Sequence, residues 1–501
     1  MVFTAFTQIR IAIFMRVRLL AWTMLLASSR GAFRGARLVP ALAQHRPAIC
    51  STARGVRMSV VTPTVKEEGV EDIDVENAKL KSEFLQRMQW RGYLAQATNL
   101  DEIDTKLTEG TVVAYLGFDA TAPSLHVGSL LQIMLLRHFQ QCGHKPIVLV
   151  GGGTTKVGDP TGKDASRQLL DEETIAKNIA GISAVFSRFL TFGDGPTDAV
   201  LVNNDDWLAE LKYLEFLRDY GRHFTINRML SFESVKQRLS RESPFSFLEF
   251  NYMILQAYDF LELSRRHKAT LQFGGSDQWG NIINGVELGR RVDGTSLYGL
   301  TSPLLATADG KKMGKTASGA VWLNAEQLSP FDYWQFWRNT ADADVGRFLR
   351  IFTELPRDEI EALERLPGAS INEAKAKLAD ETTSMLHGRE CLEEIRATAK
   401  SLFENGADAA PVDMSSLPRA QITREELASG SLTVVDLFLR LDFAKSKSEV
   451  KRLMSGGGAR INDEKIEDPL MVVSAETFAS SAEIKISSGK KKHGIVELVK
   501  A

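Results

Sequence analysis

Apolar runs alternate with glycine-containing loops between residues 111 and 153, and this alternation constrains the fold more than any other feature. Thr111–Phe118 and Pro146–Val150 have the composition of buried strands, and Ser129–Gln141 between them has the apolar periodicity of a helix. Two strands separated by a helical crossover pair in parallel. Ligands of such sheets bind at the carboxyl ends of the strands, which is where Gly117-Phe118-Asp119 and Gly151-Gly152-Gly153 lie.

The same alternation continues along the chain, so we predict an α/β fold with a Rossmann-like parallel sheet. Further helices are expected at Glu172–Phe189, Tyr213–Gly221 and Phe250–Leu263, and further strands at Val200–Asn203 and Ala269–Phe273. A chain of 501 residues exceeds a single hydrophobic core. The predicted parts are a presequence at 1–65, a Rossmann-like domain at 80–320, an α-helical domain at 321–403, a linker at 404–430 and a small α+β domain at 431–501.

The first 65 residues differ in composition from the rest of the chain. They contain nine arginines and neither lysine nor acidic residues, which is typical of an organelle transit peptide. The apolar run Leu19–Ala27 is also compatible with a secretory signal or the front of a bipartite plastid signal, and a plain disordered tail is the other alternative. Without this segment the formal charge changes from -2 to -2 - 9 = -11, so contact with nucleic acid would require local basic patches.

The first motif that carries chemistry is His126-Val127-Gly128-Ser129. A helix that starts near Leu125, after Pro123, would direct free backbone N–H groups and the positive end of its dipole toward a phosphate. Gly128 would let an adenine ring approach the backbone, and His126 could donate to a phosphate oxygen. Taken alone, these four residues are better explained by a simple helix cap formed by His126 and Ser129.

The second motif, Asp309–Thr316, places lysines in a loop punctuated by glycines. When a carboxylate attacks the α-phosphate of ATP, negative charge develops on the phosphate oxygens and on the departing pyrophosphate, and lysines on such a loop can stabilise it. A solvated lysine loop is the alternative. Between the two motifs, Tyr252, Gln256 and Asp259 share one face of a predicted apolar helix, where buried polar groups require a ligand or partners.

Six blocks, in this order, resemble the bacterial-type tyrosyl-tRNA synthetases, a class I family, and the resemblance covers nearly everything after residue 80. They are Tyr115–Asp119, His126–Ser129, Gly158–Lys163, Tyr252–Asp259, Gly274–Asn281 and Lys312–Thr316. The residues within these blocks resemble those of the α-proteobacterial branch of the family. As a set, these blocks are far more specific than either phosphate motif.

The resemblance implies a role for each matching residue. The tyrosine-binding residues would be Tyr115 and Asp259 at the phenol, Asp159, Tyr252 and Gln256 at the ammonium, and Gln278 near the carboxylate. The ATP-binding residues would be Asp119, Thr121, His126, Gly128, Ser129, Gly275, Asp277, Lys163, Arg167, Lys312 and Lys315. The residues that act in catalysis would be His126, Lys312, Lys315 and Thr316. Ser129 stands where many members of the family have a second histidine. In the lysine loop, Met313-Gly314 and Thr316 differ from the residues that are usual in the family.

The C-terminal segment resembles a small RNA-binding module found in a ribosomal protein and in pseudouridine synthases. Lys445, Lys447, Lys451 and Arg452 would contact the phosphate backbone of RNA beside Gly456-Gly457-Gly458, and a solvated helix is the alternative. The helical region at 321–403 would support the anticodon side of the tRNA.

The resemblance therefore implies a tyrosine–tRNA ligase that forms tyrosyl-adenylate from ATP and tyrosine, works as a homodimer on tRNA(Tyr), and is imported into mitochondria or, alternatively, plastids. Mg²⁺ would arrive with ATP, and no protein-bound metal is expected, because Cys50, Cys142 and Cys391 lack metal-ligand spacing. Two alternatives are a catalytically reduced relative that acts in RNA binding or splicing, and tryptophan activation on the same architecture. Tyr115 with Asp259 suits a phenol better than an indole.

Overall fold

The structure is a computed structural model that describes residues 78–161, 169–241, 244–310, 313–316, 319–403, 417–478, 481–489 and 492–499. The presequence predicted at 1–65 lies outside these residues. Among the helices of the described ranges, none is long and apolar enough to cross a membrane.

A six-stranded sheet forms the first part of the fold, with strand order β1-β6-β5-β2-β3-β4. The strands are β1 (Gln96–Ala97), β2 (Val113–Asp119), β3 (Lys145–Gly151), β4 (Val200–Asn203), β5 (Leu271–Gly275) and β6 (Tyr298–Ser302). β2 and β3 pair in parallel, from Val113 opposite Lys145 to Asp119 opposite Gly151. The other neighbouring pairs are also parallel, except that β1 runs antiparallel on β6. The predicted α/β fold with a parallel sheet is confirmed.

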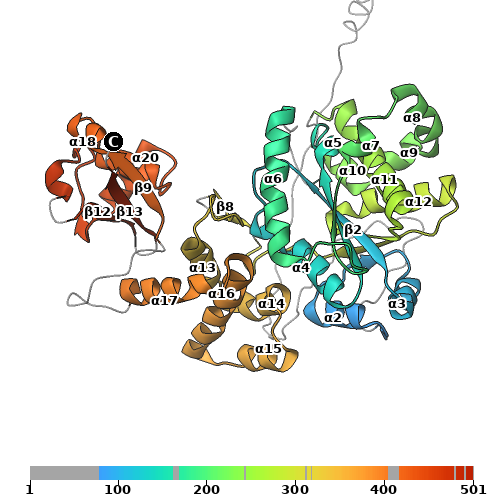
Figure 1. Cartoon of the computed structure of the whole chain (residues 1–501), viewed down its shortest axis with the longest axis horizontal. Helices are drawn as coiled ribbons and strands as arrows, with labels where there is room; N and C mark the ends of the chain where they lie inside the picture. The colour runs from blue at the N-terminus through green and yellow to red at the C-terminus, as the bar shows by residue number, and fades with distance from the viewer. Residues whose placement is uncertain are drawn as a thin grey trace, which may run out of the picture. The chain divides into compact units, whose positions relative to one another are not determined.

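Helices cover both faces of this sheet (Figure 1). Ala114, Leu116 and Phe118 of β2 pack in one core with α4 (Val127–Gln141) and α6 (Glu172–Phe189). Tyr115 points to the other face, where it packs in a second core with α11 (Phe247–His267) and α12 (Trp279–Val292). A strand that is buried on both faces has a continuous apolar sequence, which explains why β2 and β3 lack polar alternation.

Caps determine where the long helices begin and end. Asp171 accepts from the backbone N–H of Thr174 and starts α6 at the predicted residue. α11 is longer than predicted because Ser246 and Glu249 form a capping box before Phe250, and because Lys268 ends the helix in a left-handed conformation. The remaining helices of this part are α2 (Glu83–Arg91), α3 (Leu100–Glu109), α5 (Gly152–Thr155), α7 (Asp205–Leu208), α8 (Tyr213–Asp219), α9 (Ile226–Met229) and α10 (Glu233–Ser240).

A helical part follows the sheet, and its helices are α13 (Pro330–Arg338), α14 (Asp342–Phe352), α15 (Arg357–Glu364), α16 (Ile371–His387) and α17 (Glu390–Phe403). Trp337, Phe348 and Phe352 pack ring against ring in its core, with centroids between 4.8 and 6.0 Å apart.

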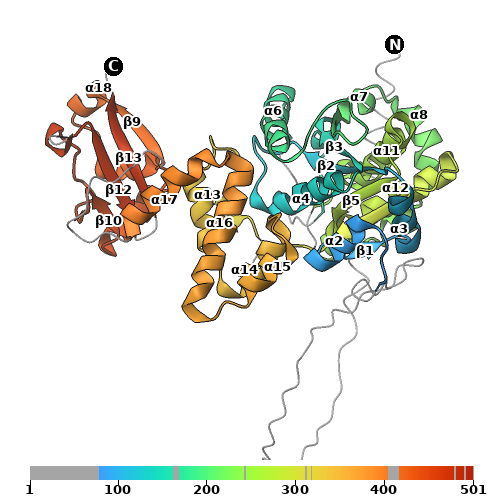
Figure 2. The same ribbon diagram turned by 60° about the horizontal axis from the view of Figure 1, so that its bottom comes forward.

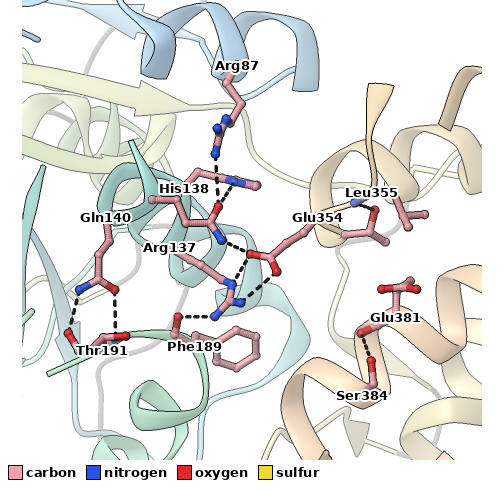
Figure 3. Close-up of polar contacts among 12 residues, drawn as sticks. Arg87, Arg137, His138, Gln140, Phe189, Thr191, Glu354, Leu355, Glu381 and Ser384 are labelled. Carbon is pink, nitrogen blue, oxygen red and sulfur yellow. Dashed lines mark hydrogen bonds and ion pairs between the residues drawn. The ribbon is translucent and has the colours of Figure 1, made fainter. Parts of the chain in front are cut away.

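Polar contacts join the helical part to the C-terminal end of α4 (Figure 3). Glu354, which follows α14, accepts from the guanidinium of Arg137, with one bond of 2.9 Å, and from the amide of Gln141. Burial alone would raise the pKa of Glu354, but the Arg137 guanidinium lowers it, so the pair stays ionised. The buried Arg91 guanidinium donates to the carbonyls of Arg350, Thr353 and Leu355. The end of α14 is therefore fixed to both α2 and α4.

The C-terminal segment forms a separate five-stranded sheet with the order β11-β10-β12-β13-β9 (Figure 2). Its elements are β9 (Arg419–Thr423), α18 (Arg424–Ala428), α19 (Val434–Arg440), α20 (Lys447–Ser455), β10 (Ala459–Ile461), β11 (Glu464–Lys465), β12 (Glu483–Ser488) and β13 (Lys492–Val499). β9 and α18 fall inside the range predicted as a linker. They are ordered because β9 pairs in parallel with β13 and buries Ile422 in the core of this sheet.

Candidate active site

The first motif begins helix α4 at the carboxyl end of β2. His126 is the N-cap residue, and its Nδ1 accepts a 2.9 Å hydrogen bond from the backbone N–H of Gly128. His126 therefore caps the helix, as the alternative interpretation of this motif predicted. Because Nδ1 accepts, the proton of the neutral imidazole lies on Nε2, which is the form that donates to an anion. Ser129 is in the first turn, and its N–H donates to the carbonyl of His126 at 2.8 Å.

The second motif packs directly on the first. Gly314 has φ +89°, and a Cβ at this position would lie 2.7 Å from the backbone nitrogen of Gly128. A Cβ on Gly128 would in turn lie 3.2 Å from the carbonyl oxygen of Met313. Both glycines are therefore required by close backbone approach. Met313 is buried between the lysine positions and anchors this segment in the core.

Some predicted residues lie outside what the structure describes. Lys163, Arg167 and Lys312 are in undescribed segments, and Lys315 and Thr316 are described through the backbone strand β7 (Lys315–Thr316) alone. β7 pairs with β8 (Gly319–Ala320) in an antiparallel hairpin.

A chain of hydrogen bonds runs from the end of β2 to the middle of α11. Asp119 accepts from the hydroxyls of Tyr252 at 3.1 Å and Thr154 at 2.8 Å. Asn204 donates to Thr154 and, at 2.9 Å, to Asp259. The sequence predicted Asp119 as an ATP ligand, and the structure connects it to Tyr252.

Asp259 is the most buried acid of this network, with 2% of its surface exposed. The indole N–H of Trp207 donates to its second oxygen at 2.8 Å. Burial raises the pKa of Asp259 to about 7, although the hydrogen bonds from Asn204 and Trp207 oppose the increase. The carboxyl group therefore keeps its proton to a higher pH than an exposed aspartate does.

Tyr115 lies on β2 close enough to Asp259 for the two to interact electrostatically. Burial raises the pKa of Tyr115, and the charge of Asp259 raises it further, so the phenol stays protonated. Its hydroxyl is fully buried and has no hydrogen-bond partner among the described residues. The Oε1 atom of Gln256 is also buried and has no hydrogen-bond partner among the described residues. Buried polar atoms of this kind usually meet a ligand or water.

A second polar group lies beyond the end of β5. Gln278 donates to Asp159 at 2.9 Å and accepts from Asn281 at 3.0 Å. Asp159 also accepts from the backbone N–H of Thr161 at 2.9 Å. Gly275 ends β5 and is buried, whereas Asp277 and Thr121 are exposed.

Sequence reasoning did not identify Thr154, Asn204 and Trp207 as site residues. The signal for two of them was the polar cluster Asn203–Trp207 directly after a strand, at the sheet edge where ligands bind. Their contacts with Asp119 and Asp259 depend on tertiary structure. The described residues hold no group of three or more His, Cys, Asp or Glu side chains arranged to bind a metal.

The four predicted RNA-binding residues are together at the start and on the surface of α20. Lys445, Lys447, Lys451 and Arg452 are all exposed. Lys447 forms an ion pair with Asp436 at 3.4 Å, while the backbone N–H of Lys445 donates to Glu449.

The parallel sheet brings the N-terminus of α4 and the second motif into contact at its carboxyl edge, an arrangement typical of nucleotide-binding α/β enzymes. The family model for class I tRNA synthetases of tryptophan and tyrosine matches residues 107–404. The chain is 60% identical over 420 residues to the tyrosine–tRNA ligase of Caulobacter sp. (strain K31), covering 84% of this chain and 99% of that protein.

Two solved structures are also similar to the chain. The C-terminally truncated mitochondrial tyrosyl-tRNA synthetase of Aspergillus nidulans has a TM-score of 0.58 and 30% identity, covering 64% of this chain and 95% of that one. The corresponding protein of Coccidioides posadasii has a TM-score of 0.55 and 32% identity, covering 63% and 91%. The chain belongs to the tyrosyl-tRNA synthetases.

The pKa of Asp259 predicts how stability changes with pH. Because the folded protein binds this proton more tightly than the unfolded chain between about pH 4 and 7, ionisation of Asp259 opposes folding, and its contribution to stability decreases as pH rises through that window. Asp259→Asn should remove this decrease. The midpoint of thermal unfolding, measured from pH 5 to 8, should fall more for the wild type than for the variant. Asp101→Asn, at an exposed acid, should follow the wild type, and parallel curves for wild type and Asp259→Asn would contradict the assignment.

Proposed function

We propose that this chain charges tRNA(Tyr) with L-tyrosine. The tyrosine carboxylate attacks the α-phosphate of ATP, pyrophosphate leaves, and the tyrosyl group then passes from the adenylate to the 3′-terminal ribose of the tRNA. The similarity to curated tyrosine–tRNA ligases over nearly their whole length carries this conclusion. It gives no support to a catalytically reduced RNA-binding relative. Tryptophan activation is disfavoured by the buried phenol and carboxyl of Tyr115 and Asp259.

Tyr115 and Asp259 would recognise the phenol of the substrate. A phenolic hydroxyl donates one hydrogen bond and accepts another, so it needs a partner of each kind. The Asp259 carboxylate can accept, and the buried Tyr115 hydroxyl, which lacks a partner in the described part of the chain, can donate. Phenylalanine would leave the buried Tyr115 hydroxyl without a partner and would deprive Asp259 of one of its donors, which is costly.

The other polar groups would bind the amino acid head. Asp159, Tyr252 and Gln256 are assigned to the ammonium, and Gln278 to the neighbourhood of the carboxylate. The hydrogen bond from Gln278 to Asp159 supports this assignment, because it places an amide beside an acid whose charge balances the ammonium. The carboxylate is already a nucleophile at neutral pH, so a general base is unnecessary and catalysis depends on positioning and on charge stabilisation.

ATP would bind where the two motifs touch. Nε2–H of His126 would donate to a phosphate oxygen, and the first N–H groups of α4 would face the same charge. Mg²⁺ would arrive as part of the ATP substrate. The remaining proposed contacts are Asp119, Thr121, Gly128, Ser129, Gly275 and Asp277 at the nucleotide, and Lys163, Arg167, Lys312, Lys315 and Thr316 at the pyrophosphate.

Residues 1–65 support import into mitochondria, because they are rich in arginine and devoid of acids. The similarity to two mitochondrial enzymes of the family is consistent with this location.

Tyr115→Phe tests the phenol site. Tyrosyl-tRNA synthetases are themselves the established example of rejection of phenylalanine, at about 10⁵-fold. Removing one of the two partners should lower the preference for tyrosine by about ten- to a hundredfold. The measurement is amino-acid-dependent pyrophosphate exchange with each substrate, compared as kcat/KM. Tyr258→Phe makes the same chemical change on α11, where the ring packs on Phe216 and Tyr220, and should keep the preference. An unchanged ratio in Tyr115→Phe would exclude the role.

The basic surface of α20 is proposed to bind tRNA. Replacing exposed Lys451 and Arg452 together by alanine should raise the KM for tRNA severalfold, because each removes a phosphate contact, and should leave pyrophosphate exchange unchanged. Replacing the exposed Lys212 and Arg218 of the α8 region together by alanine is the matched control for the loss of two positive charges. Equal charging by the double variant and the wild type at moderate salt would argue against this surface.

A homodimer is proposed through the surface of α9–α11. Five exposed apolar side chains gather in this stretch of 23 positions, including Phe247 at 67% and Ile226 at 59% exposure, together with Leu230, Leu239 and Leu248. Monomeric proteins rarely expose so many apolar side chains together, and one tRNA could then lie across both subunits. Phe247→Asp should shift the protein toward monomers in sedimentation velocity. Leu470→Asp, at an apolar side chain with 72% exposure in the C-terminal sheet region, should leave the mass unchanged. A wild type that sediments as a monomer would refute the proposal.

A further inference from the structure

A short backbone pairing joins the two nucleotide motifs. The N–H of Val127 donates to the carbonyl of Val321, and the N–H of Leu323 donates to the carbonyl of Leu125, both at 2.9 Å. His126 and Trp322 are the antiparallel bridge between these bonds. The N–H of Val321 donates to the carbonyl of Gly314 at 3.0 Å, so the pairing reaches the segment that carries Lys315.

Ser124 and Asn324 close one end of this pairing. The hydroxyl of Ser124, which is 3% exposed, lies 2.9 Å from Oδ1 of Asn324 and 2.9 Å from the carbonyl oxygen of Leu125. It accepts from the backbone N–H of Asn324 at 3.1 Å. The two residues, 200 positions apart in the chain, are therefore joined through both side chain and backbone.

Asn324 also fixes the pairing to the helices behind it. Its Nδ2 donates to the carbonyl of Gly181, in the middle of α6, at 3.0 Å. Its own carbonyl accepts from the N–H groups of Gln327 and Leu328, which starts the turn that leads to α13. One side chain thus connects α6, the loop before α4 and the segment that follows the lysine motif.

We propose that Ser124 and Asn324 are positioning residues for adenylate formation. Their hydrogen bonds hold the backbone of Leu125–Val127 against that of Val321–Leu323, and so set the distance between the imidazole of His126 and the segment that bears Lys315. Both groups must act on the same triphosphate, and small errors in such geometry strongly reduce rates. This inference rests on the proposed function, and it adds two residues that act through others.

The test compares Ser124→Ala, Asn324→Ala and the double variant in tyrosine-dependent pyrophosphate exchange. The kcat of each single variant should fall about ten- to a hundredfold, whereas the KM for tyrosine should change less than twofold, since the tyrosine pocket lies on the other face of β2. The double variant should lose about as much as the worse single variant, because both remove one connection. Asn99→Ala is the matched control, since it removes a side-chain bond to the N–H of Glu102 at the start of α3 and should retain the wild-type kcat.

Three results would overturn the inference. Wild-type kcat in both single variants would show that the connection does not affect the reaction. Strictly additive losses in the double variant would show that the two residues act separately. A parallel loss of kcat and of tyrosine binding, measured by equilibrium dialysis, would show a general structural role. Failure of the proposed function would be distinct, because the wild type itself would then show no tyrosine-dependent exchange.

Discussion

Burial of the Asp259 carboxyl group is the constraint on which the hydrogen-bond network between β2 and α11 depends. A carboxylate with 2% exposure is costly unless donors surround it, and Asn204 and Trp207 supply two. Asn204 also donates to Thr154, which in turn donates to Asp119. The hydrogen bonds of the network are therefore linked, from Asp259 through Asn204 and Thr154 to Asp119. The two donors come from the segment after β4, and the acid comes from α11. The contacts among these side chains can therefore form only when the parallel sheet has brought the ends of its strands together.

The contact between the two sequence motifs depends on the backbone instead. Gly128 and Gly314 approach so closely that a side chain on either residue would clash with the backbone of the other segment. The backbone pairing of Leu125–Val127 with Val321–Leu323 fixes the position of one glycine relative to the other. α4 starts at this contact and ends at Arg137 and Gln141, which bind Glu354 of the helical part (Figure 3). A single helix of 15 residues thus carries the first motif at one end and the contacts with the helical part at the other. Because a helix of this length is stiff along its axis, a displacement of one end of α4 would also move the other end.

The features that sequence reasoning predicts here are local, and those that it misses depend on tertiary contact. Strands β2 and β3 follow from apolar runs buried on both faces, and the start of α6 follows from the cap at Asp171. β9 falls inside the range predicted as a linker, because five residues between prolines and a helix carry little pattern and the partner strand β13 lies more than 70 positions away. Asn204 and Trp207 were missed for a similar reason, since an indole gives no sign in the sequence that its N–H will meet a buried acid. The capping bond of His126 could be predicted, whereas its consequence for the tautomer needed the geometry.

The alternation of side chains along β2 directs Tyr115 to one face of the sheet and its neighbours Ala114 and Leu116 to the other. Tyr115 points toward α11, where the phenol of the substrate would be read, while its neighbours Ala114 and Leu116 pack beneath α4, the helix that starts at the nucleotide motif. Asp119, at the carboxyl end of the same strand, bonds to Tyr252 of α11 and so marks the point where the two sides meet. In the proposed function, a change at Tyr115 would act on the choice of amino acid, and a change at the Gly128–Gly314 contact would act on the phosphates. β2 fixes the positions of Tyr115 and Asp119 relative to each other, because this central strand is hydrogen-bonded on both edges, to β3 and to β5.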